Sequence, residues 1–94
     1  MGKENLKYRL VIFDERIWAR DCDRVPRKQL ERIIERISQL ETWSVSTSVD
    51  VKKLQHYNVA DFRLRVGDYR VLLNKDDEKN EIHLLRVLHR SKLY

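Results

Sequence analysis

Residues 62–71 read Phe-Arg-Leu-Arg-Val-Gly-Asp-Tyr-Arg-Val, and this stretch decides the fold that we expect. Apolar and charged side chains alternate on both sides of Gly67-Asp68. A two-residue turn with glycine first is typical of a tight β-hairpin of the type II′ kind. Such a turn fixes the register, which places Arg65 directly opposite Arg70.

The predicted register gives the hairpin two chemically different faces, because paired residues share a face. One face is wholly apolar and reads as a core surface. The other carries three arginines, and like charges placed opposite each other destabilise a sheet. The apolar face consists of Phe62, Leu64, Val66, Tyr69, Val71 and Leu73. The basic face consists of Arg63, Arg65 and Arg70.

The rest of the chain supplies a further strand on each side of the hairpin in sequence, and two helices. Residues 8–13 are β-branched and aromatic enough for a strand, and residues 81–88 are apolar on both faces, which predicts a strand in the sheet interior. Asp14 is a candidate N-cap for a helix ending near Cys22. We expect loops at 42–53 and 75–80.

Pro26 marks the start of a second helix that runs from Arg27 to about Glu41, since proline is well tolerated in the first turn. Its apolar residues recur at helical spacing and predict one buried stripe, formed by Leu30, Ile33, Ile34, Ile37 and Leu40. The expected fold class is α+β: a single domain over 1–94, ordered β-α-α-β-β-β, whose antiparallel-rich sheet carries a two-helix hairpin on one face.

Composition narrows the class of protein. The 94 residues carry 20 Lys and Arg against 15 Asp and Glu, a formal charge of +5, with 41% hydrophobic residues. That is too apolar for a disordered chain, and no apolar run is long enough to span a membrane. The N-terminus shows no apolar signal segment, and Cys22 is the lone cysteine, so we expect a cytoplasmic protein. One cysteine and three histidines without metal-binding spacing predict neither a metal site nor another cofactor.

Positive charge is concentrated in the second half of the chain. Residues 51–75 hold six Lys and Arg against two Asp, and residues 85–94 add three basic side chains without an acid. The acids gather instead at 76–81. This pattern fits a surface that faces a polyanion, and it equally fits a basic surface that is simply solvated. The arginines favour phosphate as the ligand, because guanidinium is planar, always charged and able to bind in a bidentate manner.

The hairpin motif, together with Leu-Arg-Val-Leu-His-Arg at 85–90 and Tyr94, resembles the RelE branch of the RelE/ParE toxin superfamily. The resemblance covers nearly the whole chain and implies the same β-α-α-β-β-β order. It also implies a toxin of a type II toxin–antitoxin system that enters the ribosomal A site and cleaves mRNA, as a metal-independent endoribonuclease that inhibits translation. The hairpin alone is shared with the ParE branch, which acts on DNA gyrase.

The resemblance assigns roles to individual residues. Its catalytic set comprises Arg63, Arg65, Arg70, Arg90 and Tyr94. Several relatives have lysines where this chain has Arg63 and Arg65, and arginine cannot act as a base. Basic residues expected to contact RNA are Lys52, Lys53, Arg86 and Lys92.

RNA cleavage of this kind needs a base for the 2′-OH, cations for the phosphorane and an acid for the leaving 5′-oxygen. Tyr94 is the candidate base, and nearby cations would favour its phenolate; the alternative is a frayed terminal residue. Either Arg90 or His89 could serve the leaving group, and histidine has the more suitable intrinsic pKa.

Three functions remain open from the sequence: a ribosome-dependent nuclease, a gyrase-binding toxin of the ParE kind, and an RNA-binding homologue without activity. The co-occurrence of Arg90 and Tyr94 with three hairpin arginines favours the first. A toxin implies a cognate RelB-like antitoxin in a hetero-oligomeric complex, in addition to the ribosome and mRNA as partners and with no membrane. We expect acidic antitoxin side chains to cover the hairpin arginines.

Overall fold

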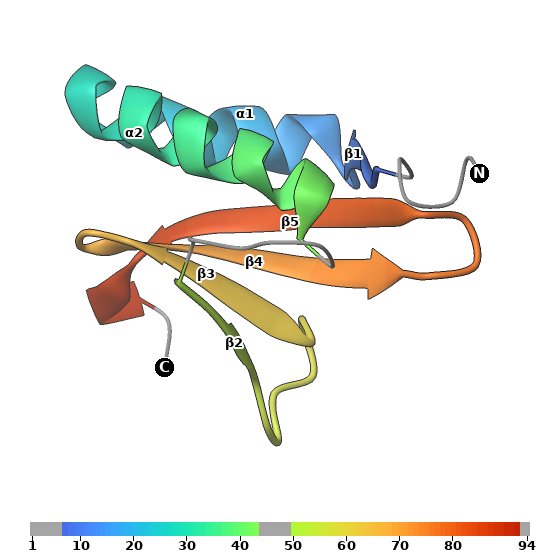
Figure 1. Cartoon of the computed structure of the whole chain (residues 1–94). Helices are drawn as coiled ribbons and strands as arrows, with labels where there is room; N and C mark the ends of the chain where they lie inside the picture. Colours follow the sequence, from blue (N-terminus) through green and yellow to red (C-terminus); the bar gives the residue numbers. More distant parts are fainter. Residues whose placement is uncertain (1–6, 44–49, 93–94) are drawn as a thin grey trace.

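The computed structural model describes residues 7–43 and 50–92, which form two helices on a five-stranded sheet (Figure 1). In chain order the elements are β1 (Arg9–Ile12), α1 (Glu15–Asp23), α2 (Arg27–Ser38), the 3₁₀ turn η2 (Gln39–Thr42), β2 (Asp50–Lys53), β3 (Phe62–Val66), β4 (Tyr69–Asp76), β5 (Glu81–His89) and the 3₁₀ turn η3 (Arg90–Lys92).

The sheet order is β1-β5-β4-β3-β2. Only β1 and β5 run parallel, and the other neighbours are antiparallel. Both helices lie in one layer over one face of the sheet, which confirms the α+β class (Figure 1). β5 has a strand on each side, as its apolar sequence predicted. No helix in the described ranges is long and apolar enough to cross a bilayer.

Local sequence sets the helix ends as expected. The carboxylate of Asp14 accepts hydrogen bonds from the backbone N–H groups of Arg16 and Ile17, at 3.0 and 3.1 Å, and so caps α1. Pro26 immediately precedes α2, where its missing N–H costs nothing. The helical conformation continues as η2 as far as Thr42, close to the predicted end.

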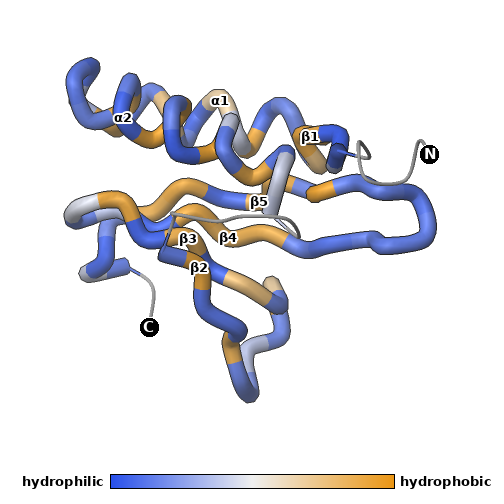
Figure 2. The backbone as a smooth tube through the Cα atoms, viewed as in Figure 1, coloured by the Kyte–Doolittle hydropathy of each residue, from blue (hydrophilic) through white to orange (hydrophobic). Residues whose placement is uncertain are grey.

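The main core lies between the helices and the sheet. Figure 2 shows the apolar sides of the helices turned toward the strands. Ile33, Ile37 and Leu40 are buried there, but Ile34 is 56% exposed, so its assignment to the buried stripe was wrong. Successive apolar residues at 33 and 34 lie about 100° apart around a helix, and only one of them can face a flat sheet.

The hairpin register is confirmed: Arg65 pairs with Arg70, Leu64 with Val71, and Val66 with Tyr69. Gly67 has φ +59°, the left-handed conformation that the first turn position of a II′ hairpin requires. The apolar face of the hairpin joins the main core, as expected.

The predicted order β-α-α-β-β-β lacks one strand, since the observed order is β-α-α-β-β-β-β, and one strand boundary was wrong. The expected loop at 42–53 contains β2, a fifth strand that pairs with β3 at the edge of the sheet. Three of its four residues are charged, as is common in edge strands, so no apolar alternation marks it in the sequence. β4 also extends two residues into the expected turn, because Lys75 and Asp76 still pair with β5.

The face of the sheet opposite the helices carries a second, smaller apolar cluster. Leu72 and Ala60 are buried there, packed with the partly buried Leu54, Tyr57 and others. Leu54 and Tyr57 belong to the segment between β2 and β3, which therefore covers part of this face. We call this side of the sheet the outer face, and the side covered by α1 and α2 the helix face.

Candidate nucleic-acid interface

Four basic residues meet on the outer face near the hairpin turn. Strand pairing places Arg65 of β3 beside Arg70 of β4, and Lys52 of β2 beside Arg63 of β3. The sequence therefore predicted the three hairpin arginines as neighbours correctly. It predicted nothing of the strand that supplies Lys52 to the same face.

Asp50 is the residue that sequence reasoning missed. It pairs with Arg65 across β2 and β3, and its carboxylate lies 2.7 Å from Arg65 Nε and 3.6 Å from Arg63 Nη1. The expected repulsion between Arg65 and Arg70 is therefore partly relieved by an acid of the chain itself. Asp50-Val51-Lys52-Lys53 carries no clear sequence signal for a strand, and the pairing with β3 is what reveals β2 and, with it, Asp50.

Arg63 is largely buried. Its side chain is only 12% exposed, and Nη1 is buried without a hydrogen-bond partner among the described residues. An unsatisfied buried donor costs on the order of 1–3 kcal/mol. Arg63 thus forms the buried back of the cluster, while Arg65, which is 55% exposed, forms its open side.

Arg70 lies at the centre of the cluster. Its Nη1 donates to the carbonyl oxygens of Gly67 and Tyr69, both at 3.0 Å, so its guanidinium stays close to the turn. Desolvation and then the charges of Arg63, Arg65 and Arg90 lower the pKa of Arg70, against an opposing effect of Asp50. The guanidinium remains charged. The pKa of Arg70 is thus lowered first by desolvation and second by neighbouring positive charge, which an anion would neutralise.

Arg90 extends this cluster from the C-terminal side. Its backbone N–H donates to the carbonyl oxygen of Asp68 at 2.8 Å, and its Nε lies 3.7 Å from the Asp68 carboxylate. The side chain is 65% exposed. We call Arg63, Arg65, Arg70 and Arg90 the arginine cluster. The sequence predicted all four of its members.

His89 lies on the other side of the sheet. It pairs with Tyr69, a helix-face residue, and their rings meet edge to face with centroids 5.3 Å apart. The Ser91 backbone N–H donates to His89 Nδ1 at 3.2 Å, so in this geometry Nδ1 is an acceptor and the ring hydrogen sits on Nε2. The structure does not bring His89 together with the arginine cluster.

The other basic residues are scattered. Lys53 pairs with Phe62 and so shares the helix face, opposite to Lys52. Arg86 is bound to Asp21 of α1 through two hydrogen bonds of 2.7 and 3.0 Å. Lys92 lies in η3 and lines a cavity together with His89. Tyr94 lies outside the described residues.

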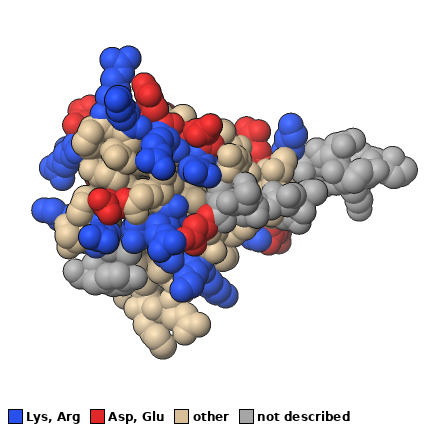
Figure 3. Space-filling view, turned by 60° about the vertical axis from the view of Figure 1, so that its left-hand side comes forward, with Lys and Arg blue, Asp and Glu red and all other residues tan. Residues whose placement is uncertain are grey.

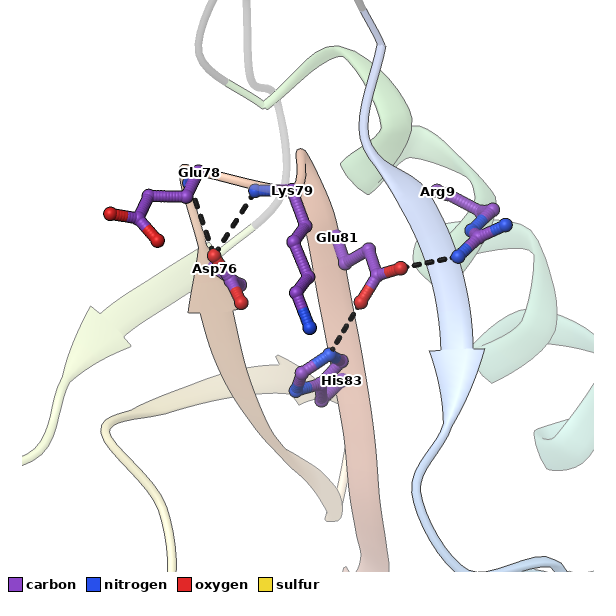
Figure 4. Close-up of polar contacts among 6 residues, drawn as sticks. All are labelled: Arg9, Asp76, Glu78, Lys79, Glu81 and His83. Carbon is purple, nitrogen blue, oxygen red and sulfur yellow. Dashed lines mark hydrogen bonds and ion pairs between the residues drawn. The ribbon is translucent and has the colours of Figure 1, made fainter.

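The opposite end of the sheet has a different character. There Glu81 binds both Arg9 and His83, and Asp76 Oδ1 accepts hydrogen bonds from the backbone N–H groups of Glu78 and Lys79 (Figure 4). The bonds from His83 and Arg9 lower the pKa of Glu81. Glu81 is thus already paired within the chain at that end. Lys and Arg side chains predominate on the side shown in Figure 3.

The arrangement can bind a phosphodiester and stabilise added negative charge on it. Arg65 and Arg90 present exposed guanidinium groups on either side of Arg70, and bidentate contacts to phosphate oxygens suit this geometry. Among the described residues, no group of three His, Cys, Asp or Glu side chains could hold a metal ion.

Three solved structures that are similar to this chain are toxin–antitoxin complexes. The chain is similar to the RelB–RelE complex of Methanococcus jannaschii (29% identity, 89% of this chain and 95% of that one, TM-score 0.69). It is similar also to the RelE–RelB complex of Pyrococcus horikoshii (28%, 90% and 97%, 0.70) and to RelBE2 of Mycobacterium tuberculosis (27%, 89% and 99%, 0.72).

No curated protein matches the chain. A family model does: the ParE toxin of the parDE type II toxin–antitoxin system matches residues 10–94. This match and the RelE-like structures agree with the resemblance carried by the hairpin and the C-terminal motif. The chain therefore belongs to the ParE toxin family of type II toxin–antitoxin systems, within the RelE/ParE superfamily.

Proposed function

We propose that this toxin is a ribosome-dependent endoribonuclease that cleaves mRNA in the A site and so stops translation. The observation that carries the proposal is the arginine cluster. It sets four guanidinium groups around the hairpin turn against two nearby carboxylates, those of Asp50 and Asp68. A phosphodiester at Arg70 would supply the missing negative charge.

In the proposed reaction the 2′-oxygen attacks the adjacent phosphorus and the bond to the 5′-oxygen breaks, leaving a 2′,3′-cyclic phosphate and a 5′-hydroxyl. Arg65 and Arg70 bind the non-bridging oxygens, whose charge grows in the transition state. Arg63 lies behind them and shares Asp50 with Arg65, whereas Arg70 is held by the carbonyl oxygens of Gly67 and Tyr69. The ribosome would hold the mRNA in the reactive geometry.

Proton transfer is assigned to the C-terminal residues. The resemblance makes Tyr94 the base that takes the 2′-OH proton. For the leaving 5′-oxygen we favour Arg90 over His89, because Arg90 is electrostatically coupled to Arg70, whereas His89 is on the helix face. An arginine would act mainly by stabilising charge on that oxygen, which would take its proton from water to give the 5′-hydroxyl.

Tyr94→Phe tests the base assignment, because it keeps the ring and removes only the hydroxyl. We expect single-turnover cleavage on programmed ribosomes to fall by about 10²–10⁴, with ribosome binding nearly unchanged. Tyr94→Ala is the matched variant. Full activity in the Phe variant with loss in the Ala variant would make the tyrosine a stacking platform instead.

A gyrase-directed toxin is the second candidate, because the matching family model is that of the ParE toxin. Induction of the toxin separates the two candidates. The nuclease should lower protein synthesis first and leave cut mRNA, which primer extension detects. A gyrase toxin should stop DNA replication first while mRNA stays intact.

We also propose a RelB-like antitoxin as partner, by analogy with the three complexes. Acidic side chains of that partner would neutralise the arginine cluster. Affinity of the purified pair should fall with rising salt, and affinity independent of salt would point to an apolar interface.

A further inference from the structure

A cavity of about 480 Å³ lies at the end of α1, apart from the outer face. β1 pairs with β5 only as far as Leu84, so no strand among the described residues pairs with the last part of β5 on that side. The cavity follows that edge. Its walls combine the apolar side chains of Val25 and Val87 with Tyr69 and His89, the edge-to-face ring pair. A cavity of this size is typical of small-ligand sites.

The charges around the cavity favour an anion. Arg24 and Lys92 line it, both are exposed, and neither forms an ion pair with a described residue. Asp21 also borders the cavity, but its carboxylate is neutralised by Arg86 and accepts a further hydrogen bond from the Val87 N–H at 3.0 Å. The acid in the wall is thus already paired, and the two cations are not.

His89 adds a ring nitrogen to the cavity wall. Ser91 occupies Nδ1, which leaves Nε2–H as the ring donor not taken by that contact. The walls therefore offer aromatic and apolar surface for a planar ring, a hydrogen-bond donor, and two cations for a phosphate. RNA-binding proteins use this combination for single nucleotides.

We propose that this cavity binds one nucleotide of the RNA strand whose scissile phosphate lies on the arginine cluster. Its base would lie against Tyr69 and His89, and its phosphate would bind Arg24 and Lys92. η3 begins with Arg90 and ends with Lys92, and so leads directly from the cluster to the cavity. The identity of the ligand as an RNA nucleotide rests on the proposed function.

Titration of the full-length toxin with adenosine 5′-monophosphate, followed by NMR of backbone and imidazole signals, tests the proposal. We expect shifts centred on Tyr69, His89 and Lys92. Arg24→Gln and Lys92→Gln should each weaken the affinity about three- to tenfold, as expected for losing one charged contact to a phosphate. Lys28→Gln removes a charge from α2 outside the cavity and should change the affinity less than about twofold.

Three results would overturn the proposal. The first is the absence of shifts at these residues with millimolar nucleotide. The second is equal shifts with inorganic phosphate, which would mean a bare anion site. The third is an antitoxin carboxylate filling the cavity in the toxin–antitoxin complex while the nucleotide fails to bind, which would assign the cavity to a protein partner.

The proposed function is judged separately, by mRNA cleavage on ribosomes. Nucleotide binding in the cavity by a toxin that leaves mRNA intact would support the nucleotide site and overturn the nuclease. Cleavage by the Arg24→Gln variant at the wild-type rate, with its nucleotide affinity also unchanged, would support the nuclease and overturn the cavity as its subsite.

Discussion

Two aspartate–arginine contacts on opposite sides of the molecule differ in how completely they are satisfied. Asp21 is buried and meets one arginine, Arg86, through two hydrogen bonds, with a third from a backbone N–H. Asp50 is 42% exposed and is shared between Arg63 and Arg65. The carboxylate of Asp21 accepts three hydrogen bonds and pairs with one cation. The carboxylate of Asp50 pairs with two cations.

The difference distinguishes an arginine that stabilises the fold from arginines that are available to a ligand. The contact with Asp21 raises the pKa of Arg86 and ties α1 to β5, so it leaves no charge for a ligand. On the outer face, desolvation and then the charges of the neighbouring arginines lower the pKa of Arg70. A basic residue is therefore a candidate for RNA contact only where its own chain has not already neutralised it, and this criterion removes Arg86 from the site we propose.

Asp21→Asn should have the largest effect on stability. It leaves Arg86 without its buried partner, and loss of one member of a buried ion pair typically costs 3–5 kcal/mol. Because Arg86 is about one-third exposed, we expect a loss of about 3 kcal/mol in the free energy of unfolding, measured with urea. Asp23→Asn, an exposed neighbour, should stay within about 0.5 kcal/mol. A loss below about 1 kcal/mol for Asp21→Asn would show that the buried contact with Arg86 stabilises the fold no more than an exposed ion pair does.

Asp50→Asn should affect binding more than stability. The exposed pair with Arg65 contributes at most about 1 kcal/mol. Removing the shared acid leaves the arginine cluster with more positive charge, so affinity for a short single-stranded RNA should rise several-fold at low salt, measured by fluorescence anisotropy. Asp61→Asn is the control, since Asp61 forms no ion pair with a described residue. Weaker RNA binding by Asp50→Asn would show that Asp50 orients the arginines more than it neutralises them.

Glu81→Gln should have the smallest effect, confined to acid pH. The pKa of Glu81 is lowered in the folded state, so its contribution is present above the unfolded value, about 4.3, and is lost as pH falls through the folded value. Stability of the wild type should therefore decline more steeply below about pH 5 than that of the variant. Parallel curves from urea unfolding between pH 6 and 3 would contradict this assignment.

The hairpin was predictable because its information is local. Gly67-Asp68 fixes the turn, the turn fixes the register, and the register places Arg65 beside Arg70. The same holds for the helix caps at Asp14 and Pro26. No contact between distant parts of the chain is needed for any of these.

Features that depend on distant contacts were not predictable in this way. β2 is short and charged, and only its pairing with β3 makes it a strand, so Asp50 was missed. His89 follows an irregularity in the pairing of β4 with β5, near Leu72, and its position on the helix face could not be read from its closeness to Arg90 in sequence. Arg86 was expected to contact RNA, but its guanidinium is bound to Asp21 of α1, a residue that is distant in sequence.

The most direct test of the central claim is single-turnover cleavage of mRNA on programmed ribosomes by the wild type, Arg70→Ala and Arg70→Lys, with gyrase supercoiling measured in parallel. We predict cleavage in the A-site codon by the wild type and no effect on supercoiling. Arg70→Ala should cut about 10²–10³ times more slowly, as expected for losing one donor to a charged transition state, with the free energy of unfolding changed by less than about 1 kcal/mol. Arg70→Lys should recover part of the rate, because it keeps the charge and loses the planar fork. Intact mRNA together with inhibited gyrase, or full cleavage by Arg70→Ala, would contradict the claim.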